Sequence, residues 1–129
     1  MTNIDLRLLP YIMLGGALGS AFRYITIVLV GGNTETFPWH TIVVNVIGCL
    51  LMGIFTELMA LYWSPSGELR VFLTVGFLGG FTTFSSFALD VGYLTSKNNT
   101  FGSVAYVVIS VSLSIVAFFS GAALIKRFY

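Results

Sequence analysis

Long uncharged stretches, separated by single charged residues, dominate the chain. The stretches without Asp, Glu, Lys or Arg include 36–56, 71–89 and 98–125, and Arg23 divides a fourth, 8–34, into two parts. A helix needs about 20 apolar residues to cross the hydrocarbon core of a bilayer. The pattern therefore predicts four transmembrane helices, at approximately Pro10 to Val30, Trp39 to Tyr62, Val71 to Leu94 and Val104 to Ile125.

Residues typical of turns separate the four spans, at 31–34, 64–67 and 96–100. Aromatic residues lie near the span ends, as they do in interfacial belts: Trp39, Tyr62, Trp63 and Tyr93. The sequence contains no internal repeat and no polar stretch long enough for a soluble domain. It predicts one all-α integral membrane domain, 1–129, of four helices.

The amino-acid composition also indicates that this chain lies in a lipid bilayer. Of its 129 residues, 57% are hydrophobic and 9% are charged, whereas an ordinary soluble domain has about 25% charged residues. The formal charge is +1, without a basic cluster, which argues against a nucleic-acid partner.

The unequal distribution of Lys and Arg between the two sides of the membrane predicts an orientation for the chain. An even number of spans places both termini and the second loop on one side, with Arg7, Arg70, Lys126 and Arg127, whereas Lys97 is alone on the other. The positive-inside rule then favours cytoplasmic termini, although the difference in Lys and Arg between the two sides is small.

The segment from Gly79 to Thr83 is poor material for a continuous helix. Two adjacent glycines precede two β-branched threonines, and the midpoint of the third span falls between Thr82 and Thr83. This predicts a third helix broken at mid-membrane, where freed carbonyls are candidate cation ligands and freed amides can meet anions. The alternative is an unbroken helix with small residues for close packing.

Two phenylalanines follow this segment. Phe84 and Phe87 are three residues apart, so a helix after the break shows both on one face, beside Ser85 and Ser86. Aromatic ring edges are positive and can touch a small anion without a full charge partner, which permits release. Packing or lipid contact is the alternative.

Polar residues also recur inside the second and fourth spans. Tyr106, Ser110 and Ser114 stand at i, i+4 and i+8, and Asn45 follows Thr41 by one turn on the same face. Each is either part of a polar pathway or a hydrogen-bonding contact between helices.

Arg23 is the single cation within a predicted span, which makes it a functional candidate. It shares a face with Gly15 and Gly19, so we expect it at a helix interface, where it adds positive potential. Asp90 lies near a span end, where simple solvation is the alternative. No nucleophile, base and orienting group stand together, and no metal-ligand cluster appears, so the sequence does not predict an enzyme.

The segment Gly79 to Phe87 (GGFTTFSSF), with Gly15 to Gly19, Arg23 and Asn45, resembles the small Fluc/CrcB-type fluoride channels. The resemblance covers the whole chain. It implies passive export of fluoride, and thereby fluoride resistance, across the bacterial cytoplasmic (inner) membrane. It further implies an inverted, dual-topology homodimer with two pores, a structural Na⁺ at its centre and no organic cofactor.

The resemblance also assigns residue roles. Phe84 and Phe87 would be the pore phenylalanines, and Asn45 the ligand on the vestibule side. The carbonyls of Gly79 and Thr82 would hold the Na⁺, Arg23 matches the family's first-span arginine, and Asp90 stands where relatives often have glutamate. The complete predicted anion pathway is Phe84, Phe87, Asn45, Ser85, Ser86, Tyr106, Ser110, Ser114 and Thr41.

Two departures and two rival functions accompany this assignment. Ser86 replaces a frequent threonine, and the Lys and Arg bias suits a pair of different chains with fixed orientations, although we favour the homodimer. One rival is a small four-span exporter of cationic drugs, which needs an embedded carboxylate where the first span carries Arg23. The other is a non-transporting membrane assembly subunit.

Overall fold

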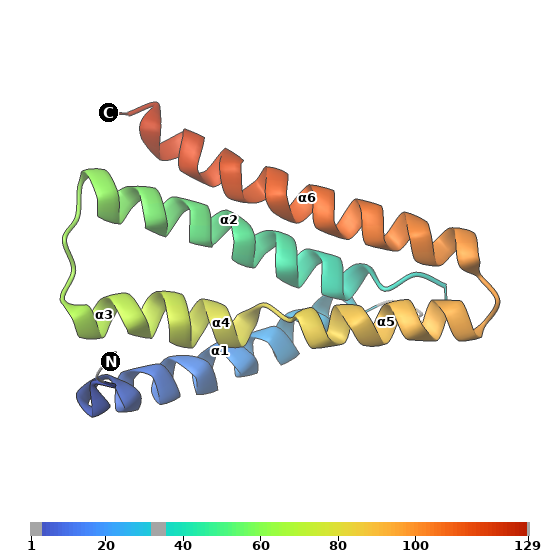
Figure 1. Cartoon of the computed structure of the whole chain (residues 1–129), viewed down its shortest axis with the longest axis horizontal. Coiled ribbons are helices and arrows are strands. Elements are labelled where there is room, and N and C mark those ends of the chain that lie inside the picture. The colour runs from blue at the N-terminus through green and yellow to red at the C-terminus, as the bar shows by residue number, and fades with distance from the viewer. Residues whose placement is uncertain (1–3, 32–35, 129) are drawn as a thin grey trace.

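The computed structural model describes residues 4–31 and 36–128, and every regular element among them is a helix. Residues 32–34 of the first predicted connector lie outside this part. Within these two ranges, four helical runs are long and apolar enough to cross a membrane, so the chain is an integral membrane protein (Figure 1). They are η1 and α1 (Leu6–Leu8 and Leu9–Val30), α2 (Trp39–Leu61), the third run (Gly67–Ser96) and α6 (Thr100–Lys126).

The third run is made of several segments. It begins with α3 (Gly67–Val71), continues as the π-helical turn η2 (Phe72–Leu78) and α4 (Gly79–Phe81), and resumes as α5 (Phe84–Ser96). Between α4 and α5 the backbone is extended, with ψ angles of 157° at Thr82 and 112° at Thr83. We call these two threonines the interruption.

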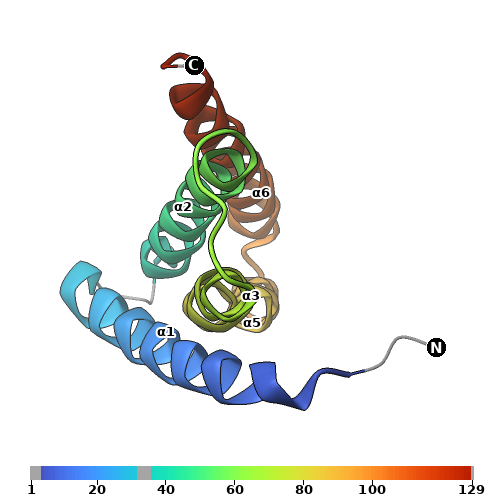
Figure 2. The ribbon, with the colours of Figure 1, turned by 90° about the vertical axis from the view of Figure 1, so that its left-hand side faces the viewer.

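The four runs pack around the interruption in two groups, α2 with α6 and α1 with the third run. α2 and α6 lie side by side over most of their lengths, and α1 packs against η2 and α4 (Figures 1 and 2). α5 continues the line of α4 and packs against α6. The interruption therefore has α1 on one side and α2 on the other. Both chain ends lie at the end of the bundle that carries the α2–α3 connection (Figure 1).

Glycines allow the backbones to approach closely. A Cβ atom at Gly19 of α1 would overlap the carbonyl oxygen of Phe77, and one at Gly53 of α2 would overlap that of Phe118 in α6. Membrane helices lack a hydrophobic force between them and associate through such close packing and hydrogen bonds. Gly15 and Gly19 are buried, as expected of the α1 packing face.

Much of the apolar surface faces outward, as in a protein that has lipid or another chain as its neighbour. Phe84 keeps 78% of its surface exposed and Val75 keeps 55%, whereas Tyr106 and Val44 are fully buried. The buried core beside the interruption contains Ile42, Phe87, Leu94 and Tyr106, contributed by α2, α5 and α6.

Candidate functional site

Side chains from two other helices hold the backbone of the interruption. Asn45 of α2 accepts from the Thr83 amide at 2.8 Å and donates to the Thr83 carbonyl at 3.1 Å. Arg23 of α1 donates from Nη1 to the Thr82 carbonyl at 3.4 Å. Extended backbone inside a membrane is tolerated where protein satisfies its polar groups. Asn45 and Arg23 therefore satisfy backbone groups that a continuous helix would satisfy internally.

Thr83 also begins α5 as its N-cap. Its Oγ1 accepts from the Ser86 amide at 3.1 Å, donates to Ser86 Oγ at 3.0 Å and lies 3.3 Å from Ser85 Oγ. The residue is 5% exposed. No site role was predicted for Thr83 from the sequence, although a threonine directly before a helix is a recognised capping signal.

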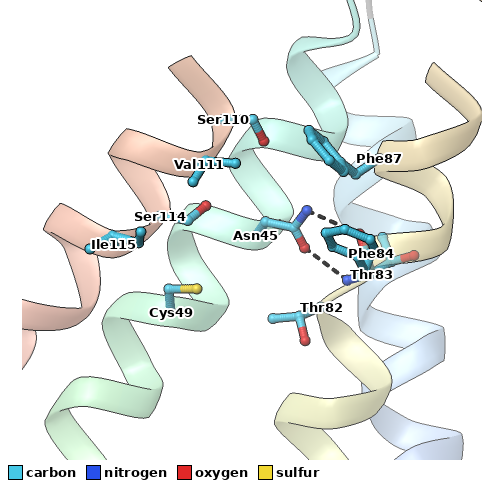
Figure 3. Close-up of a pocket in the computed structure, with 10 residues that line it drawn as sticks. All are labelled: Asn45, Cys49, Thr82, Thr83, Phe84, Phe87, Ser110, Val111, Ser114 and Ile115. Carbon is cyan, nitrogen blue, oxygen red and sulfur yellow. Dashed lines mark hydrogen bonds between the residues drawn. The ribbon is translucent and has the colours of Figure 1, made fainter. Parts of the chain in front are cut away.

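A cavity of about 280 Å³ lies beside the interruption, between α2, α5 and α6 (Figure 3). It brings together six of the residues predicted from the sequence: Asn45, Thr82, Phe84, Phe87, Ser110 and Ser114. Four further residues complete its lining: Cys49, Thr83, Val111 and Ile115. Cys49 was not predicted to belong to a pathway, and it follows Asn45 by one helical turn.

The two phenylalanines occupy different positions at this cavity. Their ring centroids are 5.2 Å apart and the ring planes meet at 45°. Phe87 is 9% exposed and packs 5.4 Å from the Tyr106 ring, whereas Phe84 is 78% exposed. Phe87 thus belongs to the core of the chain, and Phe84 forms an open side of the cavity.

A second polar cluster adjoins Phe87. The carboxylate of Asp90 accepts hydrogen bonds from Thr41 Oγ1 at 2.6 Å and from the Tyr106 hydroxyl at 2.9 Å. Thr41 and Tyr106 are both 0% exposed. Asp90 is therefore bound by two buried hydroxyls, which the sequence did not reveal. Tyr106 precedes Ser110 by one turn of α6, so polar side chains continue from this cluster to the cavity.

The remaining predicted residues lie around the cavity but do not line it. Ser85 and Ser86 bond to Thr83, and Arg23 lies across the interruption. The amides of Thr83 and Ser86 would bond the carbonyls of Gly79 and Thr82 in a continuous helix, yet they donate to side chains. Neither carbonyl therefore bonds to the amide four residues later, and that of Thr82 accepts from Arg23. Carbonyl oxygen is a ligand chemistry that suits a hard cation.

Comparison with known proteins places these features in a family. Residues 10–122 match the family model described as "CrcB-like protein, Camphor Resistance (CrcB)". A protein of Rhodospirillum centenum named "Fluoride-specific ion channel FluC" is 45% identical over 122 residues, which are 94% of this chain and 97% of the relative.

Two further relatives carry the same name. One, from Rhizobium etli, is 44% identical over 89% of this chain and 93% of its own length. The other, from a Chelativorans species, is 45% identical over 88% of this chain and 91% of its own length. On this similarity over nearly its whole length, the chain belongs to the CrcB family.

Proposed function

We propose that this chain is a passive, fluoride-selective ion channel that exports fluoride from the cytoplasm across a bacterial inner membrane. The observation that carries the proposal is the cavity beside the interruption, where an amide, two serine hydroxyls and two phenylalanine rings converge. The relatives named as fluoride-specific channels give the ion its identity.

The polar side of the cavity replaces water around the ion. Ser110 and Ser114 bring hydroxyls from α6, and hydroxyl protons can rotate toward an anion. An amide nitrogen carries two hydrogens, and Asn45 Nδ2 donates one to Thr83. Asn45 can thus hold the interruption and still offer its second hydrogen to fluoride. These donors compensate for the water that fluoride sheds on entry.

The phenylalanines make binding weak enough for release. Ring edges carry partial positive charge, which attracts an anion without the strength of a full cation. Conduction requires an ion to enter favourably and leave again. Fluoride that passes the edges of Phe84 and Phe87 is therefore attracted by each ring in turn, but neither ring binds it in a deep energy minimum.

The conducting unit in this proposal is an inverted homodimer with two pores. Phe84 is largely exposed in the single chain and leaves the cavity open, so a second copy supplies the missing wall. A two-fold axis in the membrane plane brings two interruptions together at mid-membrane. The carbonyls of Gly79 and Thr82 from both copies then form the binding site of a structural Na⁺, whose charge would hold the two interruptions together.

Transport in this mechanism needs no coupled energy source. Fluoride enters cells as the neutral weak acid and becomes the trapped anion at cytoplasmic pH. A negative interior drives the anion outward, by about 2.3 kcal/mol per 100 mV. An open, selective path is therefore sufficient for export.

The site is less suited to the two rival functions. A proton-coupled exporter of cations needs an available embedded carboxylate, but Asp90 is bound by Thr41 and Tyr106, and Arg23 adds a cation at the interruption. The hypothesis of a non-transporting subunit does not explain why an amide, hydroxyl groups and aromatic ring edges line the same cavity.

The test is ion efflux from liposomes that contain the purified protein, with fluoride and chloride electrodes and with valinomycin to carry the countercharge. Rapid loss of fluoride without chloride supports the proposal. Loss of both anions contradicts the selectivity, and loss of neither from folded protein contradicts the channel.

Replacing Phe84 by isoleucine separates a pore from mere packing. Since Phe84 is 78% exposed in the chain, we expect Phe84→Ile to leave a folded dimer whose fluoride efflux falls at least ~10-fold, because the attractive ring edge is lost. Val75→Ile, at another exposed position of the third run, is the control. A folded F84I protein that conducts normally would refute the role of Phe84.

A further inference from the structure

A second cavity, of about 430 Å³, lies between the C-terminal half of α2 and the segment formed by α3 and η2. It shares no lining residue with the cavity beside the interruption. Its lining is Met52, Thr56, Met59, Ala60, Arg70 and Thr74. The cavity is thus a separate space with one cationic side chain at its edge.

The two cavities follow each other along one face of α2. Asn45 and Cys49 line the first, and Met52 and Thr56 line the second. Positions i, i+4, i+7 and i+11 share a helix face, and Cys49 and Met52 are separated by a rise of about 4.5 Å. The same face of α2 therefore lines both cavities, one after the other along the helix.

Arg70 contributes to the lining of this cavity, and the ion pair found among residues 4–31 and 36–128 does not involve it. The cavity lining contains no acidic residue. Glu57, the neighbour of Thr56 in sequence, lies 3.6 Å from Lys126 of α6 in an ion pair. Thr74 Oγ1 donates to the Arg70 carbonyl at 2.8 Å, which ties the start of η2 to α3. The cavity thus has a cationic residue of α3 and a hydroxyl-bearing residue of α2, Thr56, in one lining.

We propose that this second cavity collects small monovalent inorganic anions and passes them to the cavity beside the interruption, with Arg70 supplying the attraction. The inference rests on the proposed channel function and deepens it, because it names where the anion first meets the protein. Thr56 offers a hydroxyl to the anion, and Met52 and Met59 form the apolar wall.

The expected size of the effect follows from Coulomb's law. One positive charge about 8 Å from a monovalent anion in water-like surroundings raises the local anion concentration about two- to three-fold. This attraction acts over a screening length of about 30 Å at 0.01 M ionic strength but only about 3 Å at 1 M. A collecting site therefore matters most in dilute salt.

The experiment compares wild type with Arg70→Gln, Arg70→Lys and Arg127→Gln in liposomes. Arg127 is the C-cap of α6, which ends at the same end of the bundle as α3 (Figure 1), and it does not line the cavity, so it controls for overall surface charge. The initial rate of fluoride efflux is measured at limiting fluoride, in about 0.01 M and about 1 M ionic strength set with potassium glutamate. Size-exclusion profiles verify that each variant is folded.

We expect R70Q to lower the rate about two- to three-fold in dilute salt and to match wild type in concentrated salt. R70K and R127Q should remain near wild type. The inference is overturned if R70Q equals wild type in dilute salt, if R127Q loses as much as R70Q, or if R70K is as slow as R70Q. Wild-type protein that moves no fluoride refutes the channel function itself, and this inference with it.

Discussion

Asn45 joins structure and chemistry in a single side chain. It makes two hydrogen bonds to Thr83, 38 residues away in sequence, one as acceptor and one as donor. The choice between helix contact and pathway ligand, which the sequence left open, is therefore not exclusive. The same amide satisfies the backbone and lines the cavity.

Replacing Asn45 tests both roles. We expect Asn45→Ala to abolish fluoride efflux and to lower the free energy of unfolding by about 1–3 kcal/mol, because two partly buried backbone groups lose their partner. Thermal unfolding in detergent and liposome efflux measure the two effects. The control is Ser20→Ala, which removes an exposed hydroxyl bonded to the carbonyl of Ala17 in its own helix. Unfolding and efflux of N45A that both match S20A would contradict this reading.

The Asp90 cluster makes a second prediction at this scale. Tyr106→Phe keeps the ring beside Phe87 but removes the hydroxyl that donates to Asp90. Hydrogen bonds to charged groups contribute about 1.5–3 kcal/mol, so we expect a loss of stability of that size.

This cluster is tested by a double-mutant cycle between Tyr106→Phe and Asp90→Asn, in which the free energy of unfolding of each variant is measured. Tyr24→Phe, at a tyrosine that is 70% exposed, provides the matched control. If the two changes were additive, the hydroxyl and the carboxylate would not be coupled in the folded protein.

At the scale of elements, the third and fourth helical runs begin before the spans predicted from the sequence. The third run begins at Gly67 and α6 at Thr100, each four residues before the predicted start. Ser66 and Asn99 cap these helices by accepting from the amides of Leu69 and Gly102. Hydropathy identifies the part of a helix that crosses lipid, whereas the cap determines where the helix begins.

Packing of α1 against the third run makes a prediction for Gly19. A Cβ atom there would overlap the Phe77 carbonyl. We therefore expect Gly19→Ala to separate α1 from η2, weaken the Arg23 contact with Thr82, and cost at least ~1–3 kcal/mol of stability. Folded yield, thermal unfolding and efflux report the change.

Gly92→Ala is the matched control, because Gly92 lies within α5 and a Cβ there meets no atom within 4 Å. Alanine favours a helix by about 1 kcal/mol over glycine, so G92A should be as stable as wild type or more stable. Equal losses of stability in G19A and G92A would show that close packing of α1 does not explain the requirement for glycine at position 19.

At the scale of the whole molecule, the proposed inverted dimer predicts equal numbers of chains in each orientation. In a Cys49→Ser background, a cysteine introduced by Arg127→Cys should be labelled to about one half by a membrane-impermeant thiol reagent from outside sealed vesicles, and fully after permeabilisation. Equal numbers arise because the Lys and Arg bias between the two sides is small. Labelling that is complete or absent from one side would indicate a fixed orientation and favour a pair of different chains.

The sequence by itself determined that the chain is a four-helix membrane protein, and it named most of the residues that line the cavity. Both are local properties, since apolar length and helical spacing can be read from neighbouring residues. Only the tertiary structure showed that Arg23 meets Thr82, 59 residues away, that Thr41 and Tyr106 bind Asp90, and that Cys49 and Thr83 belong to the cavity. A polar group removed from water needs a partner, and which distant side chain provides it depends on how the helices pack.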